Sequence, residues 1–147
     1  MKKRSKPIAL ILASVLTLCC SPAGAQAKVS DCSKGQKSAS KSRITKQINA
    51  LTKSDWKLAY GYAANSFQSS VSLDAFKEII TKQYFYLLSN SGFDFGACIT
   101  SQNIFNQLVT IRYHGEKYVL SYYLTLVDKR LGIVAAKEVK PAGTTAA

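Results

Sequence analysis

Apolar side chains recur at helical spacing through the first half of the chain. Ile44, Ile48 and Leu51 fall on one face of a predicted helix, and Lys46 and Asn49 fall on other faces. Two further helical stretches follow, each preceded by residues that can cap a helix, and their apolar stripes are Trp56, Ala59, Tyr60, Ala63 and Phe67, then Leu73, Phe76, Ile79, Ile80 and Tyr84. The pattern therefore predicts three helices.

The second half changes to the alternation with period two that is typical of strands. Residues 90–92 (NSG) are a turn signal, and Phe93 and Phe95 begin the alternation. Further strand-like runs cover residues 108–113, 117–127 and 131–139, with turn-forming residues between them. Helices followed by about four antiparallel strands predict an α+β domain. We expect the N-terminal helices to pack on one face of a curved antiparallel meander sheet.

The first 27 residues have the organisation of a secretory signal peptide. A basic start is followed by a mainly apolar run of thirteen residues, 8–20, which as a helix spans only about 20 Å of a bilayer core of about 30 Å. Small residues then favour cleavage after Ala25 or Ala27. Cys19 and Cys20 raise lipid anchoring as an alternative, although neither follows a small residue. We expect a periplasmic or extracellular protein.

Composition and charge indicate three segments in the chain after residue 27. A hydrophobic content of 47% with 19% charged residues fits a chain that buries a core. Residues 28–42, rich in Ser and Lys, predict an extended polar arm, residues 43–140 a single α+β domain, and residues 141–147 a flexible tail. The formal charge of +12 lies mostly in the signal, the arm and the first helix.

This distribution of charge bears on the partners. The basic arm makes an anionic envelope surface a candidate partner. The body of the domain is nearly neutral and carries no motif that reads bases, which argues against a nucleic-acid-binding protein.

Signal cleavage leaves two of the four cysteines, Cys32 and Cys98. In an exported chain these two predict one disulfide, whereas in a reducing compartment they would remain thiols. The bond would close a loop of 67 residues and stabilise the fold by about 4 kcal/mol in the chain-entropy model. A metal site built from these cysteines and His114 lacks ligand spacing and a fourth ligand. We expect no metal and no cofactor.

Residues 47–51 (QINAL) and 55–63 (DWKLAYGYA), continued by Phe76 and Tyr84, resemble the opening of domain-of-unknown-function family 4864, a family of exported bacterial proteins. The resemblance covers about residues 43–139. It implies the nuclear-transport-factor-2-like, cystatin-like fold, a cone in which a bent sheet wraps a long helix. It implies no catalytic residue, because the family has no established activity. Relatives of this fold often dimerise through the sheet, so a homodimer is left open.

Few residues qualify as candidates for chemistry. His114 lies in a predicted turn beside Gly115, so a mechanism based on histidine is not favoured. Asp94 is the acidic residue that falls inside a candidate strand, on the face opposite Phe93 and Phe95, and it is a weak catalytic candidate. The resemblance to this superfamily makes five aromatic residues candidates for lining a pocket, with packing in the core as the alternative: Trp56, Tyr60, Phe76, Tyr84 and Tyr122. Tyrosine suits a pocket because it combines apolar area with a hydroxyl.

Two classes of function remain after the sequence is read. The first is an exported, non-enzymatic binding or interaction module for a small apolar molecule or an envelope partner. The alternative is an enzyme of the isomerase or dehydratase kind, in which Asp94 and a Tyr act as an acid–base pair in the pocket. The two classes differ in whether a carboxylate lies inside the cone.

Overall fold

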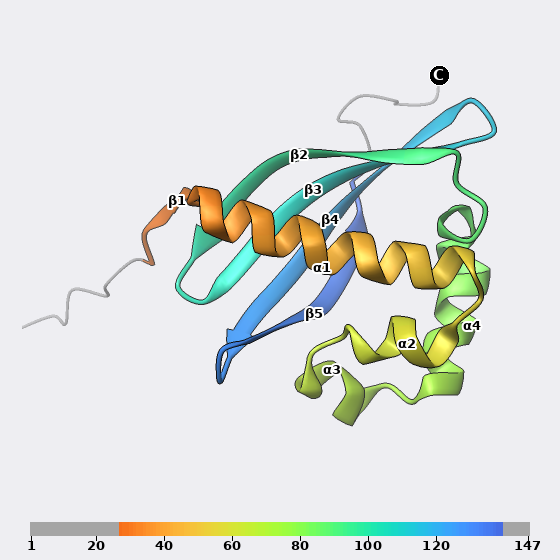
Figure 1. The fold of residues 1–147 in the computed structure, drawn as a ribbon, viewed down its shortest axis with the longest axis horizontal. Coiled ribbons are helices and arrows are strands. Elements are labelled where there is room, and N and C mark those ends of the chain that lie inside the picture. Colours follow the sequence, from red (N-terminus) through yellow and green to blue (C-terminus); the bar gives the residue numbers. More distant parts are fainter. Residues whose placement is uncertain (1–26, 140–147) are drawn as a thin grey trace, which may run out of the picture.

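The computed structural model describes residues 27–139, which form helices packed against one sheet (Figure 1). The helices are α1 (Lys34–Thr52), α2 (Trp56–Gly61), α3 (Asn65–Ser70), α4 (Leu73–Gln83) and the 3-10 helix η1 (Phe85–Leu87). The strands are β1 (Val29–Asp31), β2 (Gly92–Ser101), β3 (Ile104–Tyr113), β4 (Glu116–Val127) and β5 (Arg130–Glu138).

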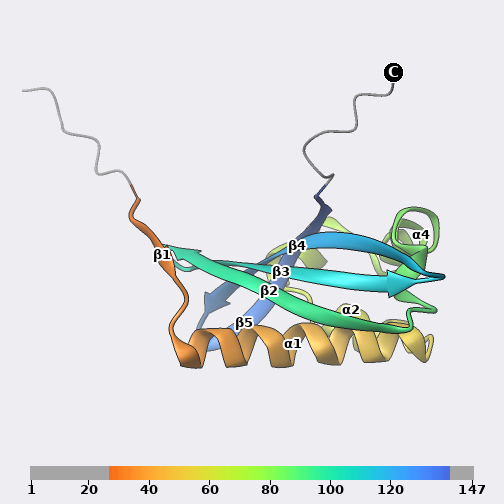
Figure 2. The same cartoon turned by 90° about the horizontal axis from the view of Figure 1, so that it is seen from above.

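The sheet is an antiparallel meander in the order β1-β2-β3-β4-β5. Strands β2 to β5 follow one another along the chain, and α1 runs along one face of the twisted sheet (Figure 2). The predicted α+β fold, with N-terminal helices on a curved antiparallel meander, is therefore confirmed. The short strand β1, which pairs with the end of β2, was not predicted.

The core lies between α1 and the sheet. Ile44, Ile48 and Leu51 of α1 are completely buried, as are Val109 of β3 and Leu120 of β4. These strand residues are partners across the β3–β4 ladder and therefore share one face of the sheet. The helical period of α1 and the alternation of the strands thus place the apolar face of α1 and the apolar face of the sheet in one hydrophobic core.

The prediction of an extended arm over residues 28–42 is wrong. Val29–Asp31 pair with β2, and α1 begins at Lys34 rather than near residue 43. The physical reason is a capping box: the Ser33 hydroxyl accepts from the Gln36 amide at 3.3 Å, and the Gln36 side chain accepts from the Ser33 amide at 2.7 Å. Ser40 is also buried, so the folded domain includes residues that precede position 43.

The second predicted helix is divided into the short helices α2 and α3. Between them, Ala63 forms a parallel bridge with Ile133 of β5. The Ala64 amide donates to the Ile133 carbonyl at 2.8 Å, and the Ile133 amide donates to the Tyr62 carbonyl at 3.2 Å. Pairing with the edge of β5 interrupts the helix, because the same backbone groups cannot serve a helix and a sheet.

The predicted signal peptide lies outside the described residues, except for its last residue, Ala27. The predicted tail at 141–147 also lies outside them. Within residues 27–139, no helix is both long enough and apolar enough to cross a membrane.

Candidate functional site

A cavity of about 360 Å³ lies between α4 and β5. Its wall is mainly aliphatic and aromatic, with Phe67, Phe76, Ile80, Leu87, Ile133 and Val134 among the lining residues. The volume is at the lower end of the range for sites that bind small molecules.

Small side chains of β5 leave this space open. Ala135 and Ala136 line the cavity, and Ala136 is the partner of Tyr122 across the β4–β5 ladder. A larger residue at position 136 would project toward the helices from the same face of the sheet as Tyr122. The contribution of β5 to this cavity is not predicted by the sequence patterns above, although two consecutive alanines in a predicted strand, Ala135 and Ala136, are a signal for it.

Three of the five predicted pocket residues line the cavity. Phe76, Tyr84 and Tyr122 are among its lining residues, whereas Trp56 and Tyr60 are not. The five candidates therefore include side chains that line the cavity and aromatic residues that pack elsewhere.

Tyr60 and Trp56 stabilise the helical layer. The Tyr60 hydroxyl donates to the carbonyl oxygens of Val71 at 2.6 Å and Gln68 at 3.0 Å. These hydrogen bonds link α2 to α3 and to Val71, the residue that follows α3. The Tyr60 ring lies 5.6 Å from the Phe76 ring between centroids. Trp56 is half-buried, and the ammonium of Lys77 lies 5.5 Å from the centre of its ring. Both residues have a structural explanation that needs no ligand.

The tyrosines of the cavity differ in how their hydroxyls are satisfied. The Tyr84 hydroxyl donates to the Ala136 carbonyl oxygen at 2.8 Å. The Tyr122 hydroxyl is buried and has no hydrogen-bond partner among residues 27–139. Burial, followed by the influence of Tyr84, raises the pKa of Tyr122 well above its usual value of 10, so that its hydroxyl stays a neutral donor. Among the described residues, the wall thus contains one buried side-chain polar group that lacks a partner.

Tyr86, two residues after the cavity-lining Tyr84, is hydrogen-bonded to a carboxylate. The Tyr86 hydroxyl donates to Oε2 of Glu138 at 3.2 Å. Burial raises the pKa of Tyr86 strongly, and the charge of Glu138 adds to this effect. Burial and Glu138 also raise the pKa of Tyr84. Glu138 is exposed and does not line the cavity.

Asp94 lies away from the cavity. Its carboxylate is exposed and forms an ion pair with Arg112 of the neighbouring strand β3. Phe95, next to it in β2, points to the opposite face, where the ammonium of Lys41 in α1 lies 5.6 Å from the ring centre. The described residues that line the cavity include no Asp or Glu, and their polar side chains besides the tyrosines are Gln47, Gln83 and Lys137. The structure does not bring Asp94 together with any of the pocket candidates.

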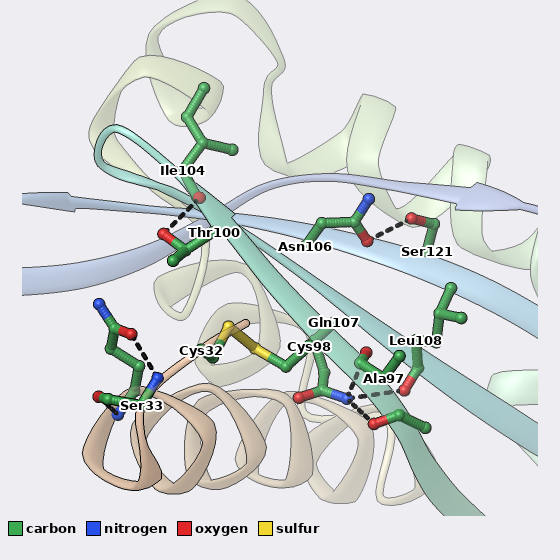
Figure 3. The surroundings of a disulfide bond; sticks show 12 residues. Cys32, Ser33, Ala97, Cys98, Thr100, Ile104, Asn106, Gln107, Leu108 and Ser121 are labelled. Carbon is green, nitrogen blue, oxygen red and sulfur yellow. Dashed lines mark hydrogen bonds between the residues drawn. A yellow bond between two sulfur atoms is a disulfide. The ribbon is translucent and has the colours of Figure 1, made fainter. Parts of the chain in front are cut away.

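The two predicted disulfide cysteines are joined. Cys32, between β1 and α1, forms a disulfide with Cys98 of β2, and their Cα atoms are 5.4 Å apart (Figure 3). Both residues are buried. His114 is exposed in the β3–β4 turn. In the described part of the chain, no group of three or more His, Cys, Asp or Glu residues is arranged to hold a metal ion.

Helical structure over residues 34–42 arranges the lysines of the predicted arm. Lys34, Lys37 and Lys41 are exposed and, together with Ser38, line a shallow groove on α1. α1 contains no acidic residue. The three lysines therefore lie on one face of a helix rather than along an extended segment.

The model of the family described as Domain of unknown function (DUF4864) matches residues 34–143, well over half of the chain. The matched segment starts at the first residue of α1. No curated protein and no solved structure matches the chain.

Proposed function

We propose that this chain, which belongs to the family Domain of unknown function (DUF4864), binds a ligand without catalysing a reaction. The cavity between α4 and β5 offers the surface of a ligand site, and within residues 27–139 its lining residues include no carboxylate and no histidine. The ligand we infer is a small apolar molecule with a hydrogen-bond acceptor. We further propose that the protein is exported and works in the periplasm or outside the cell. The disulfide between Cys32 and Cys98 supports an oxidising compartment.

The observation that carries the proposal is the buried Tyr122 hydroxyl in a mainly apolar wall. A buried hydroxyl without a partner is costly, by about 1–3 kcal/mol. An acceptor atom on a ligand would remove this cost, while the apolar wall would bury the rest of the molecule. Apolar area would then supply most of the affinity, and Tyr122 would select for the acceptor.

The alternative of an isomerase-like enzyme gains no support from the position of Asp94. That mechanism needs a carboxylate next to the substrate, within hydrogen-bond reach of the proton that it moves. Asp94 is exposed, paired with Arg112 and absent from the cavity wall. We therefore favour binding over catalysis.

A cavity-filling variant tests the binding function. Protein purified from its export compartment would be extracted and searched for bound small molecules, and the neutral fluorescent probe N-phenyl-1-naphthylamine would be titrated into it. Ala136→Phe should abolish probe binding, whereas Ala97→Phe, an exposed position in β2, should leave it unchanged. Equal probe binding by wild type and Ala136→Phe, with no extracted molecule, would refute the proposal.

A second proposal concerns the lysine groove of α1. We propose that Lys34, Lys37 and Lys41 hold the protein against the anionic lipid surface of the envelope, since their side chains share one exposed groove. Replacing all three by Ser should reduce co-sedimentation with phosphatidylglycerol vesicles and its sensitivity to salt. The matched control replaces the exposed Lys57, Lys77 and Lys129. Equal losses in both triple variants would mean that net charge alone governs the association.

A further inference from the structure

Two arginines from distant parts of the chain meet at the end of α2. Arg43 lies in α1, and Arg130 is the first residue of β5. The Arg43 Nε donates to the Tyr62 carbonyl oxygen at 3.2 Å, and the Arg130 Nη2 donates to the Gly61 carbonyl oxygen at 3.4 Å. Because the two acceptors are consecutive in the chain, both guanidinium groups are held at the C-terminal end of α2.

This pair of positive charges has no carboxylate partner. Within residues 27–139, the side-chain ion pairs join Lys82 with Glu78 and Arg112 with Asp94. Burial lowers the pKa of Arg43, and the positive charge of Arg130 lowers it further, which indicates that the two groups repel each other. The carbonyls accept hydrogen bonds from the arginines but do not neutralise their charge.

Arg43 also has a donor that is not used. Its Nη2 is buried and has no hydrogen-bond partner in the described part of the chain. The guanidinium lies against the Tyr62 ring, 5.1 Å from the ring centre, which holds its plane in one orientation. A fixed guanidinium with an unsatisfied donor is suited to an oxyanion, whose oxygen can accept a charge-assisted hydrogen bond from Nη2.

Space for a ligand is present beside Arg130. A depression of about 280 Å³ lies between the start of α3 and the β4–β5 hairpin. Arg130, Ser66 and Thr125 are among its lining residues, whereas Arg43 lies outside its lining, behind Arg130. Asp128 also lines it, but no ion pair joins Asp128 to Arg130. The Arg130 side chain is exposed and is held by a single long bond, so it can turn to admit an anion to the buried donor of Arg43.

We propose that Arg43 and Arg130 form a binding site for a phosphate group, whose two negative charges match the two guanidinium charges. Arg43 supplies the fixed donor, and Arg130 closes over the anion from the exposed side. This site is separate from the cavity at Tyr122 and from the lysine groove, so it does not depend on either proposal above. The phosphate comes either from free inorganic phosphate or from a phosphomonoester such as a lipid headgroup.

Calorimetric titration and thermal unfolding at constant ionic strength test this site. Inorganic phosphate should bind wild type at a single site and raise its unfolding temperature, and acetate should do neither. Arg130→Gln should weaken phosphate binding about tenfold to a hundredfold, as expected for the loss of a hydrogen bond between charged groups. Arg130→Lys, which keeps the charge without the planar fork, should also weaken it. Glycerol 3-phosphate as a second titrant distinguishes the sources, because a headgroup site should bind it more tightly than inorganic phosphate.

The control replaces the neighbouring charge. Lys129→Gln removes one positive charge from the same hairpin, and it should leave phosphate binding unchanged within about twofold. Arg43→Gln should abolish binding, and if this variant does not fold, Arg130→Gln and Arg130→Lys still decide the question. No saturable binding in wild type, or equal weakening by Lys129→Gln and Arg130→Gln, would overturn the proposal.

Discussion

Gly132 of β5 lies so close to Ala64 that a Cβ atom on Gly132 would stand 2.5 Å from the Ala64 Cα atom. This contact lies beside the hydrogen bonds that attach residues 62–64 to the edge of β5. The close approach covers part of an edge strand that would otherwise expose unpaired backbone groups. It also fixes the chain between α2 and α3, and hence the carbonyls of Gly61 and Tyr62 that hold Arg43 and Arg130.

We predict that Gly132→Ala destabilises the fold by about 1–3 kcal/mol or more, because a backbone contact at this distance must move apart. Urea unfolding would measure the change in the free energy of unfolding. Gly61→Ala is the matched control, since nothing lies within 4 Å of the added Cβ, and it should be neutral or stabilising by up to about 1 kcal/mol. A Gly132→Ala protein as stable as wild type would mean that the contact does not constrain the edge.

Removal of the disulfide should lower the free energy of unfolding by about 2–5 kcal/mol. The bond between Cys32 and Cys98 attaches the start of α1 to β2. The double variant Cys32→Ser, Cys98→Ser would be compared with oxidised and reduced wild type by urea unfolding. Reductant should shift the unfolding midpoint of wild type and leave that of the double variant unchanged. A wild-type midpoint that is insensitive to complete reduction would contradict this prediction.

Gln107 should stabilise the β-bulge of β2, which lies between Phe95 and Cys98. The register between β2 and β3 shifts between Phe95 and Cys98, and the buried Gln107 amide donates to the carbonyl oxygens of Gly96 at 2.9 Å and Ala97 at 3.2 Å (Figure 3). Gln107→Leu removes this donor from both carbonyl oxygens and should cost about 0.5–1.5 kcal/mol, the net contribution of a typical hydrogen bond.

The matched control for this substitution is Gln83→Leu, at an exposed position, which should change the free energy of unfolding by less than about 0.5 kcal/mol. Thermal and urea unfolding would measure both variants. If the two leucine variants lost the same stability, the hydrogen bonds of Gln107 would not support the bulge.

Alkaline pH should destabilise the protein through its buried tyrosines. The pKa values of Tyr84, Tyr86 and Tyr122 are raised in the folded state above the ordinary value of 10. Below about pH 10 these hydroxyls are neutral in both states, so their effect on stability is constant. Above it, the unfolded chain loses protons that the folded chain retains, and the free energy of unfolding falls as pH rises.

Urea unfolding between pH 8 and about pH 11 would measure this slope. Tyr122→Phe should reduce it, because one of the raised pKa values is removed. Tyr123→Phe is the control on the neighbouring residue of β4, which points to the other face of the sheet, and it should keep the wild-type slope. Identical slopes in wild type and Tyr122→Phe would exclude a contribution from that hydroxyl.

Sequence patterns predicted the elements well wherever a local period governs them. The apolar spacing of residues 44–51 and the alternation of residues 108–113 both reappear in the structure as buried faces. Ser33 and Gln36, at the spacing of a capping box, were a readable signal for the start of α1 that the lysine- and serine-rich composition obscured. The division between α2 and α3 had no comparable signal, because it depends on pairing with Ile133, far along the chain.

The sequence by itself determined the α+β class, the pairing of Cys32 with Cys98 and the family, because these follow from local periods, cysteine number and short motifs. Only the tertiary structure decided which aromatic residues line the cavity, where Asp94 points and which charges meet. Tyr60 and Tyr122 have equivalent places in their local patterns, yet one is tied to α3 and the other faces a cavity left by Ala136. Arg43 and Arg130 meet only because α1 and β5 both contact the end of α2. Local spacing sets the face on which a side chain lies, whereas long-range packing sets what that face meets.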